Sequence, residues 1–182
     1  MRRILLLFIV TIAAITLSAQ EEPTRIEARG DLNKDGISDM VVVTTDSTRT
    51  VLSIYFGTTE GQQQLWKTYD NVIPIAEDEN TSIDTSLEIT AKGVLLISWQ
   101  MFASMGGWGS DRESYYYRYQ NGDFYLIGYE SRSLQRNTGD IETISENYLT
   151  WKRQVVKENA MDDSAPKKEK WTRMAKRPLK KL

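Results

Sequence analysis

The chain has 182 residues, with 23 Lys and Arg against 25 Asp and Glu, and it contains neither histidine nor cysteine. Without these two residue types, a Ser-His-Asp triad, a cysteine nucleophile, a disulfide and an ordinary zinc or copper site are all excluded. The formal net charge of −2 gives no basic surface for nucleic acid, so oxygen ligands and carboxylate chemistry remain as the options.

The first 19 residues have the layout of a secretory signal peptide. Two arginines precede an uncharged apolar run from Ile4 to Leu17, and small residues follow at Ser18 and Ala19. A run of this length is too short to span ~30 Å of hydrocarbon as a helix. We therefore expect cleavage after Ala19 and a periplasmic or secreted protein with no stable membrane span after cleavage; an uncleaved membrane anchor is the alternative. The remaining 163 residues are enough for one domain.

The first motif of the mature chain is GDLNKDGISDMVVV, residues Gly30 to Val43. Its oxygen-bearing side chains stand at loop positions 1, 3, 5 and 9, which are Asp31, Asn33, Asp35 and Asp39. Calcium takes six to eight oxygen ligands, and alternate side chains of a tightly wound loop can converge on one ion. Gly36 would make the sharp turn, and Ile37 would contribute its backbone carbonyl. The alternative is an ordinary polar turn, since Asp, Asn and Gly also favour turns without any ion.

This loop differs from an EF-hand, because position 12 is Val42 instead of a bidentate Glu, and because Met40–Val43 is typical of a strand. The pattern D-x-N-x-D-G-x-x-D before an apolar strand resembles the calcium loops of FG-GAP and VCBS repeats, which are known from integrin α-subunit propellers. The likeness extends from Gly30 to Gly57. It implies a structural calcium ion and a propeller-blade-like N-terminal part. The implied ligands are Asp31, Asn33, Asp35, the carbonyl of Ile37, and Asp39.

Short strand-like runs follow, with turn residues between them. Met40–Thr45 and Thr50–Phe56 are predicted strands on either side of an Asp-Ser turn. The polar run Glu77–Asp84 is predicted to be an acidic loop. After it, Leu87–Thr90 is a short strand, and Val94–Phe102 is apolar enough to be buried on both faces of a sheet.

The clearest hairpin is SYYYRYQNGDFYLIGYE, from Ser114 to Glu130. Asn121-Gly122 suits the positive φ angles of a two-residue type I′ turn. This turn would place Tyr119 opposite Phe124 and Tyr117 opposite Leu126. The predicted faces are then Tyr115, Tyr117, Tyr119, Phe124 and Leu126 on one side, and Tyr116, Arg118, Tyr125, Ile127 and Tyr129 on the other.

The C-terminal part predicts an antiparallel pair, Ile141–Leu149 with Lys152–Lys157. Residues 159–182 are expected to form a basic linker in which Lys170–Met174 is a possible edge strand. Its positive charge indicates a solvated terminus or, as the alternative, attraction to anionic lipid or polysaccharide. The regular spacing of short strands predicts one all-β domain over residues 20–158. Its architecture would be an antiparallel meander of hairpins, arranged as a curled sheet, an open barrel or a sandwich.

Two weaker clusters lie beside the glycine-rich loop Met105–Gly109. Trp99, Trp108 and Tyr116 are candidate ligand-binding aromatics for sugar rings or peptide side chains; the alternative is that they pack the sheet. Asp111 and Glu113 could form a carboxylate pair for glycoside hydrolysis.

These features predict an exported calcium-binding β-domain that acts as a non-enzymatic binding or interaction module at the cell envelope. Its expected cofactor is calcium, and its expected partner is an envelope protein or a glycan, with no role for nucleic acid. The alternative is a carboxylate-dependent glycan hydrolase or a glycan-binding protein that uses the Gly/Trp loop.

Overall fold

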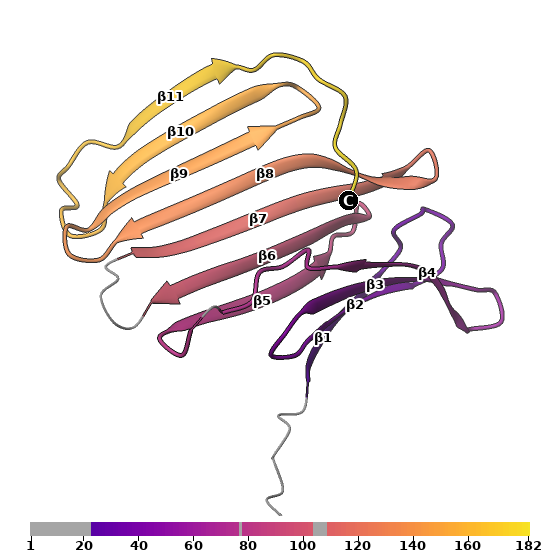
Figure 1. Ribbon diagram of the computed structural model, residues 1–182. Helices are drawn as coiled ribbons and strands as arrows, with labels where there is room; N and C mark the ends of the chain where they lie inside the picture. The colour runs from indigo at the N-terminus through magenta and orange to yellow at the C-terminus, as the bar shows by residue number, and fades with distance from the viewer. Residues whose placement is uncertain (1–22, 77, 104–108) are drawn as a thin grey trace, which may run out of the picture.

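The computed structural model describes residues 23–76, 78–103 and 109–182, and this part of the chain forms eleven β-strands. Each strand pairs antiparallel with its sequence neighbour inside one of two sheets (Figure 1). The predicted all-β antiparallel meander is therefore confirmed. The described strands do not close into a barrel, because the two sheets remain separate. The same residues include no helix that could span a membrane, and the predicted signal peptide, residues 1–19, lies outside them.

The small sheet contains the first four strands in sequence order. Their bounds are β1 (Thr24–Gly30), β2 (Asp39–Thr45), β3 (Thr50–Gly57) and β4 (Gln63–Asp70). The strands predicted at Met40–Thr45 and Thr50–Phe56 are confirmed as β2 and β3. Asp46 shapes the turn between them, since its Oδ1 accepts the N–H groups of Thr48 at 2.7 Å and Arg49 at 3.0 Å.

The large sheet contains the other seven described strands. In sheet order they are β11 (Lys168–Arg173), β10 (Lys152–Asn159), β9 (Asp140–Asn147), β8 (Asp123–Gln135), β7 (Gly109–Gln120), β6 (Val94–Ala103) and β5 (Thr81–Ile89). The loop predicted for Glu77–Asp84 is wrong at its C-terminal end, because β5 already begins at Thr81. Partly buried Thr81 and Ile83 alternate there with exposed Ser82 and Asp84. The polar residues thus occupy the solvent-facing positions of an amphipathic strand.

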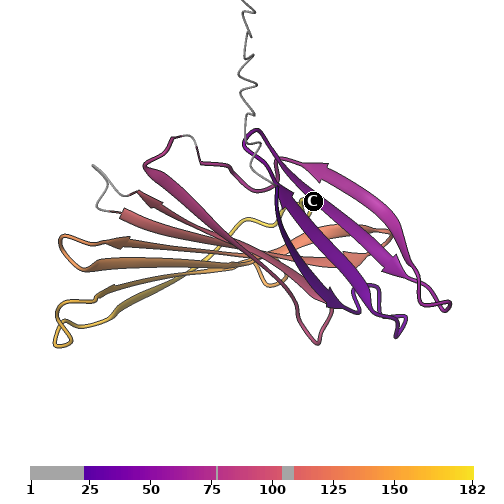
Figure 2. The same cartoon turned by 90° about the horizontal axis from the view of Figure 1, so that it is seen from below.

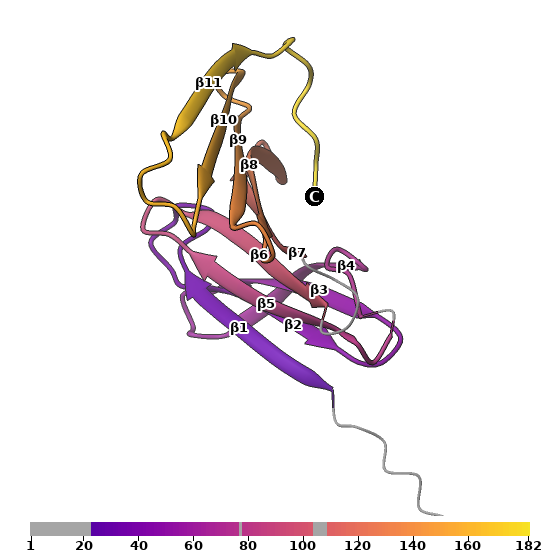
Figure 3. The same cartoon turned by 90° about the vertical axis from the view of Figure 1, so that its left-hand side faces the viewer.

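One hydrophobic core fills the space where the two sheets face each other. It contains Val41, Val43, Leu52 and Ile54 from the small sheet and Leu95, Ile97, Tyr117, Phe124 and Leu126 from the large sheet. The small sheet covers only one corner of the large sheet, and β9–β11 extend beyond it (Figures 1, 2 and 3). The expectation that Val94–Phe102 is buried on both faces is wrong at its end, where Met101 and Phe102 are 39% and 38% exposed.

The β7–β8 hairpin has the predicted turn. Asn121 and Gly122 have φ angles of 51° and 78°, as a type I′ turn requires, and Tyr117 pairs with Leu126. Beyond that pair, a β-bulge between Tyr116 and Tyr117 shifts the register, so that Tyr115 pairs with Tyr129. The predicted face of Tyr129 is therefore wrong: the extra residue of the bulge brings its ring to 5.1 Å from the ring of Tyr115.

The chain ends in a segment that returns to the core, which we call the C-terminal strap, residues 174–182. It leaves β11, the outermost strand of the large sheet, and runs back to the β7–β8 hairpin (Figure 1). Leu126 N–H donates to the carbonyl of Lys180 at 2.8 Å, and Leu182 N–H donates to the carbonyl of Phe124 at 3.0 Å. Leu182 also packs against the core. The edge strand predicted at Lys170–Met174 is present as β11.

Candidate functional site

The predicted metal loop connects β1 to β2 and is wound by the first of its acidic residues. Asp31 Oδ1 accepts the N–H of Lys34 at 2.7 Å, and Asp31 Oδ2 accepts the N–H of Gly36 at 3.0 Å. The chain turns sharply at these two donor residues, with φ angles of 69° at Lys34 and 84° at Gly36. Glycine adopts such angles without steric cost, which explains its position in the motif.

Asn33 and Asp35 shape the exposed part of the loop. Asn33 Oδ1 accepts the N–H of Asp35 at 3.0 Å, and the Asn33 amide donates to Asp35 Oδ2 at 2.9 Å. Asp35 Oδ1 in turn accepts the N–H of Ile37 at 2.8 Å. Asp and Asn make bonds of this kind in ordinary turns, so the polar-turn interpretation accounts for this conformation without an ion.

Asp39 is different, because it is fully buried. Its Oδ2 accepts the N–H of Leu32 at 2.7 Å, and its Oδ1 accepts the N–H of Gly57 at 2.9 Å. The carboxylate thereby ties the start of the loop to the end of β3. A Cβ on Gly57 would lie 2.4 Å from the carbonyl oxygen of Ser38, so glycine is needed for this close approach.

The loop also contacts the turn between β5 and β6. Lys34 Nζ donates to the carbonyl of Ala91 at 3.2 Å. A Cβ on Gly93 would lie 2.6 Å from the carbonyl oxygen of Asp31, so the two segments are packed backbone to backbone. The loop therefore joins the small sheet to the large one.

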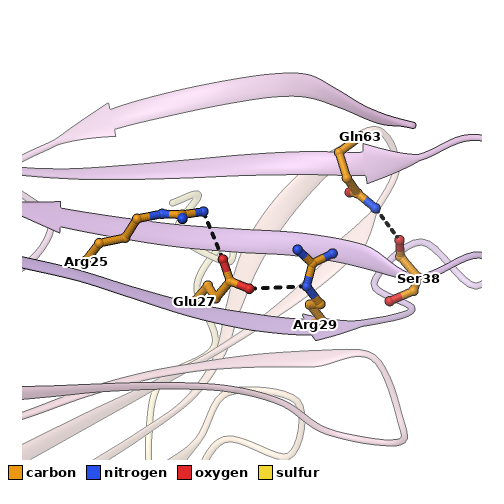
Figure 4. Close-up of polar contacts among 5 residues, drawn as sticks. All are labelled: Arg25, Glu27, Arg29, Ser38 and Gln63. Atoms are coloured by element: carbon orange, nitrogen blue, oxygen red, sulfur yellow. Dashed lines mark hydrogen bonds and ion pairs between the residues drawn. The ribbon is translucent and has the colours of Figure 1, made fainter. Parts of the chain in front are cut away.

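Two sets of polar contacts lie beside the loop (Figure 4). The Gln63 side chain donates to the carbonyl of Ser38 at 2.9 Å and fixes the end of the loop. On β1, Glu27 accepts from Arg25 at 2.8 Å and from Arg29 at 3.3 Å. Glu27 is thus held by two guanidinium groups and is not part of the loop.

The loop residues fit calcium in chemical type. They offer the hard oxygen donors that calcium prefers, and a carboxylate has about four lone-pair sites, so one or two N–H bonds leave capacity for a cation. Among the described residues, however, no three acidic, histidine or cysteine side chains are grouped closely enough to hold a metal ion. The side chains of the loop would therefore have to move closer together when an ion binds.

A second candidate is a cavity of about 520 Å³, which we call the aromatic cleft. It lies between the end of β4, with the residues just after it, and the core-facing side of β6 and β7, and the C-terminal strap also lines it. Its lining includes Tyr69, Asn71, Trp99, Tyr115, Tyr117 and Leu182. The rings of Trp99 and Tyr115 stack with centroids 4.9 Å apart and planes inclined by 15°. The Tyr115 hydroxyl donates to Glu113 Oε2 at 2.5 Å.

Two tyrosine hydroxyls of the aromatic cleft lack hydrogen-bond partners among the described residues. The Tyr69 hydroxyl is buried and unpaired. Tyr117 is only 8% exposed, and its hydroxyl makes no hydrogen bond in the described part of the chain. Burial raises the pKa of each to about 12, with a further contribution from Asp123 for Tyr69 and from Tyr69 for Tyr117. Both hydroxyls are therefore neutral at physiological pH and can donate as well as accept.

The aromatic residues predicted to act together are placed on different faces. Trp99 lines the aromatic cleft, whereas Tyr116 points from the opposite face of β7 into a separate cavity beside Arg118 and Ile127. This separation follows from the alternation of side chains along a strand. Trp108 lies outside the described residues.

The candidate carboxylate pair shares one face of β7. Asp111 is exposed, and Glu113 accepts the hydroxyl of Tyr115. Neither residue lines the aromatic cleft.

Sequence reasoning missed several residues of the cleft, namely Tyr69, Asn71 and the end of the strap. They come from distant parts of the chain, and no local pattern unites them. Comparison with protein-family models, curated proteins and solved structures finds no match to this chain.

Proposed function

We propose that the protein is an exported calcium-binding β-domain that acts as a binding module at the cell envelope. The main support is the conformation of the Asp31–Asp39 loop, which is wound so that Asp31, Asn33 and Asp35 keep their oxygens at or near the surface. Export is supported by the N-terminal sequence alone. The uncovered area of the large sheet supports the role in binding, since it leaves broad strand surface available for a partner.

Asp31, Asn33, Asp35 and Asp39, together with the carbonyl of Ile37, would hold the ion. Bound calcium would offset two of the three negative charges on the loop's carboxylates, whose mutual repulsion opposes a compact conformation. Asp39 would accept the ion in addition to its two N–H bonds. The loop joins the two sheets, so calcium would stabilise the contact between them.

Thermal unfolding in calcium and in chelator tests this proposal. A ligand that binds only the folded protein stabilises it by about 2.7 kcal/mol at a hundred times its Kd. We expect Tm to rise with calcium between micromolar and millimolar concentrations and to fall with EGTA, with a smaller response to magnesium. Asp35→Ala should remove the response and keep the β-sheet circular dichroism spectrum.

Asp46→Ala is the matched control. Asp46 caps the β2–β3 turn with the same kind of side-chain bonds, but it lies outside the motif. This variant should keep the full calcium response. If wild type and Asp35→Ala melt alike in calcium and in EGTA, the loop is only a polar turn.

A further inference from the structure

We propose that the aromatic cleft binds a neutral sugar ring of a glycan, with the hydroxyls of Tyr69 and Tyr117 as hydrogen-bonding groups and Trp99 as an aromatic contact. This inference deepens the proposed function as a binding module and rests on it, but it does not depend on calcium. The proposed glycan site differs from the one predicted from the sequence, because it does not include Tyr116, which faces the other side of the sheet.

The two unpaired hydroxyls are the first reason. A buried donor or acceptor without a partner costs about 1–3 kcal/mol, so native proteins pair nearly all such groups with protein, water or ligand. Here the buried, unpaired hydroxyl is that of Tyr69, and Tyr117, whose hydroxyl makes no hydrogen bond in the described part of the chain, belongs to the lining of the same cavity. Tyr69 is also close enough to Tyr117 to contribute to its raised pKa. A polar occupant between them would supply the missing hydrogen bonds.

The aromatic wall is the second reason, because it selects the kind of polar occupant. Trp99 and Tyr115 both line the cleft, and their apolar rings stack on each other with centroids 4.9 Å apart. A sugar ring combines an apolar C–H face, which can lie against such a surface, with a rim of hydroxyls that donate and accept. A tyrosine hydroxyl is likewise both donor and acceptor, so it can pair with a sugar hydroxyl in either sense.

The size and charge of the cleft agree with a neutral ligand. Its volume of about 520 Å³ falls within the usual range for small-molecule sites. Its rim has both signs of charge, from Asp70 on one side and Lys180 and Lys181 on the other. Lys181 is already paired with Asp123 at 2.8 Å. The tyrosines remain uncharged, so the cleft offers no concentrated positive charge to an anion.

The test uses three neutral probes, namely cellohexaose, maltohexaose and the hexamer of β-1,4-linked N-acetylglucosamine. Binding to the full mature chain is measured by calorimetry and by saturation-transfer NMR. We expect at least one probe to bind the wild type. Tyr117→Phe and Tyr69→Phe each remove one hydroxyl and keep the ring, and each should weaken binding about threefold to tenfold. Trp99→Leu should weaken it at least as much.

Tyr119→Phe is the matched control, since Tyr119 shares a strand and a face with Tyr117. Its ring packs against Phe56 and Phe124 at 5.1 Å, outside the cleft lining. This variant should bind the probe as the wild type does. Unfolding curves of all variants confirm that they are folded, and the two Tyr→Phe changes in the cleft keep the proposal testable if Trp99→Leu does not fold.

Two results would overturn the inference. If none of the three probes binds at millimolar concentration, the hydroxyls are hydrated and the cleft is not a sugar site. If a probe binds but Tyr69→Phe and Tyr117→Phe bind it unchanged, the sugar site lies elsewhere. Repeating the sugar titration in EGTA separates this inference from the calcium proposal. A Tm that does not change with calcium would refute the calcium proposal, whereas sugar binding that persists in EGTA would still support the cleft as the sugar site.

Discussion

Asp35 and Asp39 belong to the same motif, yet their surroundings give them different roles. Asp35 is exposed and bonds only within its own loop. Asp39 is fully buried and accepts N–H groups from Leu32 and Gly57, which lie on two separate segments. Asp39 is therefore part of the fold itself, whether or not an ion is bound.

Replacing Asp39 with alanine should destabilise the protein even in EGTA. The change leaves the buried N–H of Leu32 and the partly buried N–H of Gly57 without an acceptor, and at about 1–3 kcal/mol each the expected loss is about 2–6 kcal/mol. Urea unfolding followed by tryptophan fluorescence measures it. Asp35→Ala in the same chelator should lose much less, because its partners are exposed. Equal losses for the two variants would contradict this division of roles.

Six tyrosines of the protein should lose their hydroxyl protons at a higher pH than free tyrosine does. Burial is the main cause that raises the pKa of Tyr69, Tyr115, Tyr116, Tyr117, Tyr129 and Tyr148 above the ordinary value of 10. For Tyr69 and Tyr117 the folded pKa is about 12. Below pH 10 both the folded and the unfolded chain keep these protons. Between about pH 10 and 12 only the folded chain keeps them, so its stability falls as pH rises.

Absorbance at 295 nm measures this titration. In water, the tyrosine signal should continue to grow well above pH 10, whereas in concentrated urea all nine tyrosines should ionise near 10. Tyr69→Phe should remove part of the late signal. It should also raise thermal stability slightly, since it deletes an unpaired buried hydroxyl. Identical titrations in water and urea would contradict the burial of these groups.

At the scale of single elements, the β7–β8 hairpin depends on its turn. Gly122 has a φ of 78°, and a Cβ there would meet no atom within 4 Å. Gly122→Val therefore tests the backbone angle without a steric clash. We expect a loss of about 1 kcal/mol or more in the free energy of unfolding, because a β-branched residue resists positive φ.

Gly109→Val is the comparison for this change. Gly109 begins β7, the first strand of this hairpin, and a Cβ there would make only ordinary contacts, at 3.7 Å to Asp111 and 3.9 Å to Gln135. Its variant should unfold nearly as the wild type does. A smaller loss at Gly122 than at Gly109 would show that the turn angle is not the limiting feature of the hairpin.

At the scale of the whole molecule, the two sheets share one core, but only part of the large sheet contributes to it. Val41, Ile54 and Leu95 are completely buried, whereas every residue of β11 is exposed. Edge strands of this kind are commonly protected by charged side chains, and β11 has Lys168, Lys170 and Arg173. Local stability should therefore fall from the shared core toward β11.

Hydrogen–deuterium exchange followed by mass spectrometry should show this gradient. Peptides from β2, β3 and β6 should exchange slowest, through global unfolding, and peptides from β10 and β11 should exchange much faster. A sugar that binds the aromatic cleft should slow exchange in β6, β7 and the strap. Uniform protection across both sheets would indicate that the extended part of the large sheet is covered in solution.

The sequence by itself determined the local elements. Asn121-Gly122 specified a type I′ turn and the Tyr117–Leu126 pairing, since few residues other than Asn and Gly tolerate positive φ. Alternating and β-branched runs specified β2 and β3. The Asp31–Asp39 motif specified a wound polar loop with its turn at Gly36. Each of these depends on interactions between residues near one another in the chain.

Only the tertiary structure decided which of these elements meet. A single bulge moved Tyr129 beside Tyr115, and strand alternation separated Trp99 from Tyr116. The aromatic cleft joins Tyr69 to Leu182 because the strap returns across the sheet. Asp39 faces inward because Gly57, at the end of another strand, offers it an N–H. The physical reason is that side-chain period and turn angles are local, whereas bulges, sheet coverage and cavities are set by long-range packing, for which no short stretch of sequence contains the partner.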